Sequence, residues 1–139
     1  MRDYANPALN SNLLLALAIH EAITLYAIRY VIDPSSSYKQ LSGKNAAFDY
    51  LQFPRQTLEY KAGDCDDLSI LYTALLQAIG IETAFITIPG HIYMAFSLGV
   101  PDWQVLRQFA YAEDLIIRDG SVWIPVEITS IGSGFMKAW

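Results

Sequence analysis

The feature that most constrains this chain is a single cysteine at the start of an apolar helical segment. Leu68 to Ile79 carries apolar residues at helical spacing, and Gly80 ends the pattern, as a glycine after a helix often does. Cys65 comes just before this segment, and Gly63 lets the chain turn ahead of it. A thiol at that position faces the unpaired N–H groups and the positive end of the helix dipole, and both favour the reactive thiolate.

The same cysteine also has an ordinary structural interpretation. A lone cysteine in a folded protein is commonly a small buried apolar residue. Asp64, Asp66 and Asp67 surround Cys65, and their negative charge raises the pKa of a thiol. This stretch alone favours neither interpretation, so the rest of the chain has to decide.

Composition and charge exclude several classes of protein. The 139 residues suit one domain, and a hydrophobic fraction of 53% supplies a full core. The net charge of −5 argues against a nucleic-acid partner, because no basic stripe is present to meet phosphates. One cysteine cannot form an internal disulfide, and the N-terminus lacks a signal-peptide layout, so the compartment is left open. We expect residues 1–139 to be one domain of a longer protein, with neighbouring domains as its partners.

The apolar run from Leu13 to Ile32 is about long enough to cross a bilayer. His20, Glu21 and Arg29 interrupt it, however, and ionisable residues at mid-depth are costly. We therefore predict a buried central helix rather than a membrane span.

Local signals predict the elements around this helix. Ser11 or Asn12 is expected to cap its start. A loop with a short helix over Asn45–Leu51 is expected to follow it, and Phe53–Leu58 is predicted to be an extended run that leads into a turn before Cys65.

Beyond Gly80 the sequence becomes typical of strands. Four segments have this character: Ile81–Ile88, His91–Leu98, Ala112–Ile117 and Ser121–Thr129. The turn dipeptides Pro89-Gly90 and Asp119-Gly120 predict two antiparallel hairpins, separated by a loop over Gly99–Gln108. Helices followed by antiparallel strands predict an α+β fold, with the helices packed on one face of a small sheet.

Cys65, His91 and Glu127 together suggest a nucleophilic site. An imidazole can take the thiol proton and return it to a leaving group, and a carboxylate can fix the ring and steady its charged form. If the two hairpins lie side by side, His91 and Glu127 can sit on neighbouring strands. Each also has a simpler interpretation: His91 as a turn residue, and Glu127 as an outward-facing strand residue.

Four motifs in order resemble the transglutaminase-like superfamily. They are Gly63-Asp-Cys-Asp-Asp67, Gly80-Ile-Glu-Thr-Ala84, Gly90-His-Ile-Tyr93 and Trp123-Ile-Pro-Val-Glu-Ile-Thr129. The resemblance implies a papain-like fold with Cys65 as nucleophile, His91 as base and Glu127 as acid. The family more often has aspartate at the last of these positions.

The other groups of the candidate site are less clearly indicated by the sequence. The Cys65 N–H is one natural oxyanion donor, and Gln56 and Tyr60 are candidates for a second, although packing or capping would also explain them. Asp64 or Asp66 is expected to cap the helix. Cys65, His91 and these acids could in principle form a calcium or zinc site, but the thiolate ligands are too few for a structural zinc site. We therefore expect no metal and no cofactor.

The resemblance implies attack of Cys65 on an amide of a peptide or protein. Hydrolysis is favoured over cross-linking, because a domain of this size lacks the extra barrels of the large animal transglutaminases. Two alternatives stay open. The first is a peptide-binding module without catalysis, lined by Trp103, Trp123 and Tyr93, and the second is a scaffold domain with Cys65 in its core.

Overall fold

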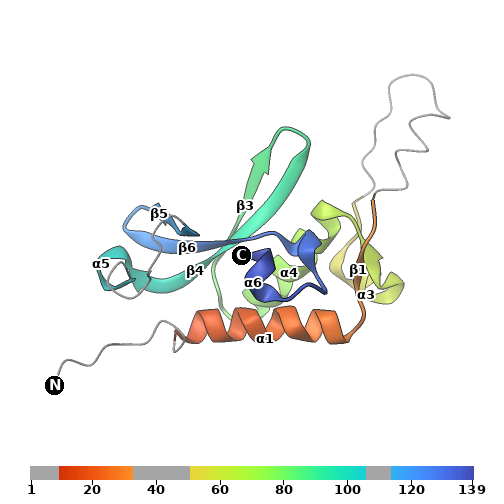
Figure 1. Ribbon diagram of the computed structural model, residues 1–139, viewed down its shortest axis with the longest axis horizontal. Helices are drawn as coiled ribbons and strands as arrows, with labels where there is room; N and C mark the ends of the chain where they lie inside the picture. The colour runs from red at the N-terminus through yellow and green to blue at the C-terminus, as the bar shows by residue number, and fades with distance from the viewer. Residues whose placement is uncertain (1–9, 33–50, 106–113) are drawn as a thin grey trace.

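The computed structural model describes residues 10–32, 51–105 and 114–139. It has the α+β architecture predicted from the sequence, with helices against an antiparallel sheet (Figure 1). Helix α1 (Ser11–Leu25) lies along one side of the molecule, and helix α4 (Cys65–Ala78) lies between α1 and the sheet. The β3–β4 hairpin projects away from this core.

The sheet consists of two hairpins joined side by side, in the order β3-β4-β6-β5. Its strands are β3 (Thr83–Ile88), β4 (His91–Pro101), β5 (Ile116–Arg118) and β6 (Ser121–Val126). Both predicted hairpins are confirmed, since β3 pairs with β4 and β5 with β6. The central pair β4–β6 places Met94 opposite Val126. The predicted loop over Gly99–Gln108 is wrong in part, because β4 continues to Pro101 and a short helix α5 (Asp102–Val105) follows it.

Alternating side chains divide the sheet into two faces. In β6, Val122, Ile124 and Val126 are fully buried, whereas the intervening residues are partly exposed. The buried face meets the apolar face of α4, which contributes Leu68, Leu71, Tyr72 and Leu76 to the core. The described residues therefore share a core that lies between α4, α1 and one face of the sheet.

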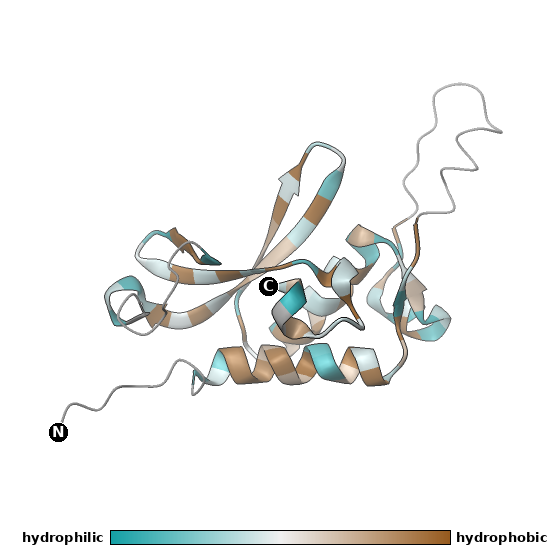
Figure 2. Ribbon diagram, viewed as in Figure 1, coloured by the Kyte–Doolittle hydropathy of each residue, from teal (hydrophilic) through white to brown (hydrophobic). Residues whose placement is uncertain are grey.

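Helix α1 differs from the predicted buried helix over Leu13–Ile32. It begins after Asn10, whose side chain accepts the Leu13 N–H at 3.0 Å, so neither Ser11 nor Asn12 is the cap. It ends at Leu25, and its outer face is apolar and exposed (Figure 2). None of the helices in the described parts of the chain has the length and apolar content to cross a membrane.

After α1 the chain enters a small second sheet that the sequence did not predict. Strand β1 (Arg29–Tyr30) runs parallel to β2 (Ala62–Gly63), with Tyr30 opposite Gly63. The turn between α1 and β1 contains Ala27 in the left-handed conformation, at φ 64°. This pairing brings the end of the first segment beside the residues that precede Cys65.

The segment before Cys65 is helical rather than extended. Helix α3 (Pro54–Tyr60) begins at a proline, which suits the first position of a helix because its missing N–H would be unpaired there. The Gln56 side chain accepts the Phe53 N–H at 2.9 Å and closes the first turn. The short helix predicted over Asn45–Leu51 falls almost entirely outside the described residues, and Leu51 itself is not helical.

Candidate active site

Cys65 is the first residue of α4, as the sequence predicts. Asp64 caps the helix by accepting the Asp67 N–H at 3.1 Å, and Asp67 accepts the Asp64 N–H at 3.2 Å in return. The other carboxylate oxygen of Asp67 accepts the Gln52 N–H at 2.8 Å. Two aspartates therefore fix the turn that carries the cysteine, and this makes Asp64, rather than Asp66, the cap.

Gly63 allows the backbone to approach this capping pair. A Cβ at position 63 would lie 2.7 Å from the Asp67 Cβ and 3.3 Å from the Thr57 Cγ2. No real Cβ atom comes as close as the first of these distances, so a side chain here would displace the turn. Glycine is needed at this position for space, since its φ is not positive.

His91 and Glu127 come together from neighbouring strands. His91 opens β4, and Glu127 follows β6 by one residue, so the prediction that Glu127 lies within the strand is wrong. The Nε2 atom of His91 is hydrogen-bonded to the Oε2 atom of Glu127. Their side chains are 31% and 35% exposed, so solvent reaches both.

Glu127 is held by groups other than the histidine. Its Oε1 accepts the Thr129 hydroxyl at 2.6 Å and the Thr129 N–H at 3.2 Å. Burial raises the pKa of Glu127, but the hydrogen bonds from Thr129 and His91 outweigh it and lower the pKa below its ordinary value. The carboxylate is therefore ionised at neutral pH and locked in orientation.

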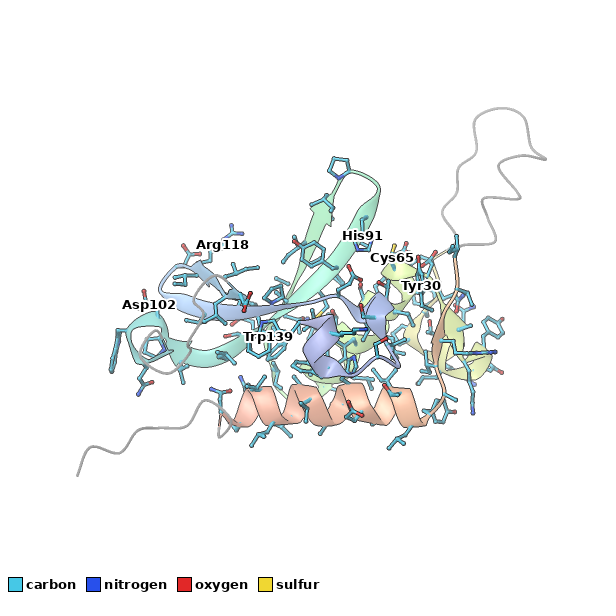
Figure 3. All side chains as sticks on the ribbon, viewed as in Figure 1. Tyr30, Cys65, His91, Asp102, Arg118 and Trp139 are labelled. Atoms are coloured by element: carbon cyan, nitrogen blue, oxygen red, sulfur yellow. The ribbon has the colours of Figure 1, made fainter. Side chains whose placement is uncertain are left out.

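The sulfur of Cys65 lies at the start of β4, against the backbone of Ile92 (Figure 3). The Ile92 N–H, one residue after His91, donates a hydrogen bond to it. Burial raises the pKa of the Cys65 thiol, and the Asp66 and Asp64 carboxylates add to this. The backbone N–H groups of Ile92 and Asp66 oppose the rise without cancelling it. Of the two opposing effects considered from the sequence, the charge of the aspartates acts in the direction of the net pKa shift and the N–H groups of the helix start act against it.

Asp64 is itself unusual among the acids at the site. Burial, a hydrogen bond to Asp66 and the charges of both neighbouring aspartates raise the pKa of Asp64 to about 8. Asp64, Cys65 and Asp66 have ligand atoms within 4.8 Å of one another, which is close enough to share a cation.

Tyr30 also lies at the site, and it is not among the residues predicted from the sequence. It lies on β1 opposite Gly63, is 41% exposed, and appears near Cys65 in Figure 3. Burial raises the pKa of Tyr30, followed by the negative charges of Cys65, Asp64 and Glu127. The aromatic and β-branched run from Ile28 to Ile32 is the strand signal that could have identified it.

The two proposed side-chain oxyanion donors both lie on α3. The Gln56 carboxamide oxygen caps that helix through the Phe53 N–H. Tyr60 is at the C-terminal end of α3 and is 60% exposed.

Comparison with known proteins gives one match. A family model described as the transglutaminase-like superfamily matches residues 16–128. That range includes most of α1, all of α3, α4 and the four-stranded sheet, and the three residues Cys65, His91 and Glu127. Neither the curated proteins nor the solved structures yield a match.

Proposed function

The chain belongs to the transglutaminase-like superfamily, and from this premise we propose that it catalyses thiol-dependent acyl transfer at an amide bond of a peptide or protein. One observation carries the proposal. An ionised and anchored Glu127 binds the Nε2 atom of His91, at the strand end where the Ile92 N–H meets the Cys65 sulfur. This leaves Nδ1 as the ring atom available to exchange a proton with the thiol.

The reaction begins with a neutral thiol. Because the pKa of Cys65 is raised, a standing thiolate is disfavoured in the free protein. His91 takes the thiol proton as the sulfur attacks the amide carbon, and Glu127 stabilises the imidazolium that forms. The Cys65 N–H, with Gln56 or Tyr60 as a second donor, would bind the oxyanion of the tetrahedral intermediate.

Collapse of that intermediate breaks the C–N bond. The imidazolium gives its proton to the departing amine, which leaves an acyl thioester on Cys65 and a neutral His91. Water then attacks the thioester with His91 as the base, and this yields a carboxylic acid and the free thiol. We propose water as the acceptor because Cys65 is only half-buried and the His91 and Glu127 side chains beside it are open to solvent.

Alkylation kinetics test this proposal directly. Iodoacetamide should modify Cys65 in the native protein, and His91→Ala should slow that reaction at neutral pH, because the proton acceptor is lost. Cys65→Ala should lose all hydrolysis of peptide substrates. An unreactive Cys65 in folded protein, or full hydrolysis by Cys65→Ala, would refute the proposal.

The raised pKa of Cys65 also favours a second candidate function, a peptide-binding module without catalysis. In that case Cys65→Ala would bind peptides as the wild type does, and the wild type would show no turnover. Measuring binding and hydrolysis with the same peptides separates the two functions.

A further inference from the structure

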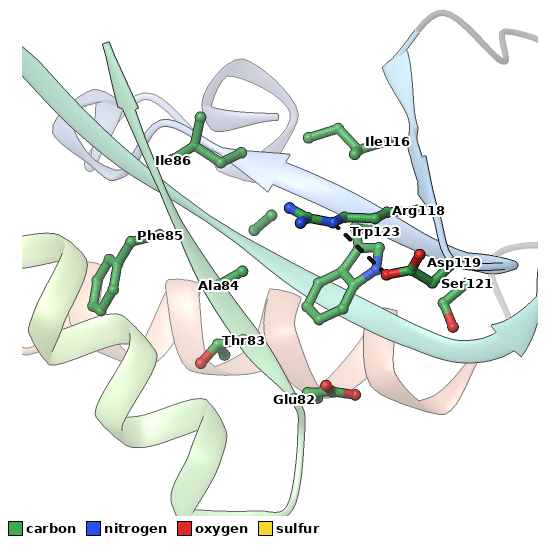
Figure 4. A pocket seen from close by; sticks show the side chains of 11 residues that line it. Glu82, Thr83, Ala84, Phe85, Ile86, Ile116, Arg118, Asp119, Ser121 and Trp123 are labelled. Atoms are coloured by element: carbon green, nitrogen blue, oxygen red, sulfur yellow. Dashed lines mark ion pairs between the residues drawn. The ribbon is translucent and has the colours of Figure 1, made fainter. Parts of the chain in front are cut away.

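The sheet has a hollow on the face that α4 and α1 leave uncovered (Figure 4). Its volume is about 490 Å³, within the range of small-ligand sites. Its principal lining residues come from all four strands and are Ala84, Ile86, Ala95, Ile116, Arg118 and Trp123. The hollow is a surface feature distinct from the turn that carries Cys65.

The lining suits a large apolar side chain. Ala84 and Ala95 face each other across β3 and β4, and these small residues leave room beside the Trp123 ring. The rim carries both signs of charge, since Arg118 and Asp119 form an ion pair at 3.8 Å. Glu82 adds a second carboxylate to the lining. The apolar floor therefore favours an aromatic or large aliphatic group over an anionic one.

One face of β4 connects this hollow to the candidate site. Side chains two residues apart along a strand share a face, so His91, Tyr93 and Ala95 form one row. The rings of His91 and Tyr93 stack with their centroids 6.1 Å apart. Ala95 lines the hollow, and at roughly 3.3 Å per residue it lies about 13 Å along the strand from His91.

Trp123 lines the hollow from β6, the strand next to β4. It pairs with Ser97, which is about 20 Å along β4 from His91 at the same rise per residue. An extended peptide has nearly the same rise as a strand. The distance from His91 to the hollow therefore corresponds to about four to six peptide residues.

We propose that the hollow binds a large apolar side chain of the peptide substrate, four to six residues away from the amide that Cys65 attacks. The inference rests on the proposed function for the position of the attacked amide. The occupant is a single aromatic or long aliphatic residue of an otherwise extended acyl donor. The hollow thereby sets substrate specificity at a distance from the reacting atoms.

A series of thiol-directed peptide probes tests this inference. Each probe carries one phenylalanine in a glycine–serine background, at one to eight residues from the reactive group. The rate of Cys65 labelling should peak with phenylalanine four to six residues away, about tenfold above the probe without phenylalanine, which is the gain from roughly 1.4 kcal/mol of apolar contact. Equal rates at all positions would overturn the inference.

Two charge-matched variants on β3 sharpen the test. Ala84→Arg places a long side chain in the hollow and should remove the advantage of the phenylalanine probes over the plain probe. Thr87→Arg adds the same charge to the same strand at an exposed position outside the lining, and it should keep that advantage. If both variants behave alike, the hollow is not the binding site.

Binding without reaction separates this inference from the proposed function. Calorimetry of the best phenylalanine peptide with Cys65→Ala protein should show binding that Ala84→Arg abolishes, even if no probe ever labels Cys65. An absence of binding to Cys65→Ala would overturn the inference while leaving alkylation of Cys65 by iodoacetamide intact. A dimer that dissociates on Ala84→Arg would also overturn it, and would assign the hollow to a second copy of the chain.

Discussion

The Nε2 atom of His91 is hydrogen-bonded to the Oε2 atom of Glu127, across 36 residues of sequence and two neighbouring strands. In this arrangement Nδ1 is the ring atom that remains for the thiol. In the mechanism that we propose, the carboxylate acts through its charge, because it would stabilise the imidazolium formed when Cys65 attacks.

Glu127→Gln should therefore lower peptide hydrolysis about 100-fold, within the range that proton-transfer catalysis contributes. Alkylation of Cys65 should persist at a reduced rate, since His91 is still present. Steady-state hydrolysis and iodoacetamide kinetics measure the two effects. Glu59→Gln, an exposed carboxylate on α3, is the control and should behave as wild type. Wild-type turnover in Glu127→Gln would mean that the acid is a different residue.

Thr129 should act as a positioning residue through Glu127. Its hydroxyl donates to the Glu127 Oε1 at 2.6 Å and helps to lower the pKa of Glu127. Thr129→Val should raise that pKa, so activity should begin to fall at a higher pH on the acid side of the profile. Hydrolysis at neutral pH should drop about tenfold, because a hydrogen bond to a charged group contributes about 1.5–3 kcal/mol.

Thr129→Ser is the matched control because it keeps the hydroxyl. It should restore both the rate and the pH profile, and a pH–rate curve for each variant checks this. If valine and serine give the same profile, the hydroxyl has no part in orienting the acid.

Asp66 should hold back the reactivity of Cys65. Its carboxylate is the largest charge contribution that raises the pKa of the Cys65 thiol, after burial. Asp66→Asn should move the pH profile of Cys65 alkylation about half a unit to one unit lower, the effect of a nearby charge in partly solvated surroundings. A profile that stays in place or moves to higher pH would contradict this assignment. Loss of a first-turn acid should also cost about 0.3–1 kcal/mol of stability.

Several parts of this fold could be predicted because their signals are local. The helical period after Cys65, with Asp64 ahead of it and Gly80 behind it, identifies α4 correctly. The two turn dipeptides identify both hairpins. His91 and Glu127 become neighbours only if the two hairpins lie side by side. The turn signals do not predict that placement, and the family resemblance was needed for it.

Other parts depend on contacts that no local pattern encodes. Apolar residues continue through most of the segment from Leu13 to Ile32, so no change of period marks the end of α1 at Leu25 or the left-handed Ala27. Tyr30 reaches the site only because β1 pairs with β2 from more than thirty residues away. The alternating sequence of β6 continues through Glu127, which is why Glu127 was predicted to lie in the strand. Glu127 instead caps the 3₁₀ helix η3 (Ile128–Ser130), so the strand ends one residue earlier.

Gly63→Ala tests whether the turn before Cys65 depends on close backbone approach. The added Cβ would lie 2.7 Å from the Asp67 Cβ, so the capping pair must move. Overpacking of this kind costs about 1–3 kcal/mol, which should lower the urea midpoint by about 1 M. The alkylation profile of Cys65 should change as well.

Gly80→Ala provides the contrast for that experiment. A Cβ there meets no atom within 4 Å, but φ is +83°, so the expected cost is the roughly 1–2 kcal/mol of a left-handed alanine. Stability should fall while the alkylation profile of Cys65 is unchanged. An unaltered profile in Gly63→Ala would show that the turn tolerates the extra atom.

His20 should make the fold sensitive to acid. It is fully buried, and neither ring nitrogen has a hydrogen-bond partner among the described residues. Tyr72 of α4 and Phe135 of helix α6 (Phe135–Ala138) pack against its ring edge-to-face, and Glu21 on its own helix lies 3.7 Å from Nδ1, beyond hydrogen-bond reach.

Burial lowers the pKa of His20 in the folded protein below 6.5, although Glu21 opposes the shift. As the pH falls below about 6.5, the unfolded chain takes up a proton before the folded chain does. The free energy of unfolding should therefore be highest above that pH and should decrease toward lower pH, until the folded protein is also protonated.

His20→Leu should remove this part of the pH dependence, and it should relieve the roughly 1–3 kcal/mol cost of buried, unpaired polar atoms. Glu21→Gln should act in the opposite direction and increase acid sensitivity, because the charge that raises the His20 pKa is gone. Urea unfolding of the three proteins between pH 5 and 7.5 checks both, and parallel curves for wild type and His20→Leu would show that His20 does not titrate with unfolding.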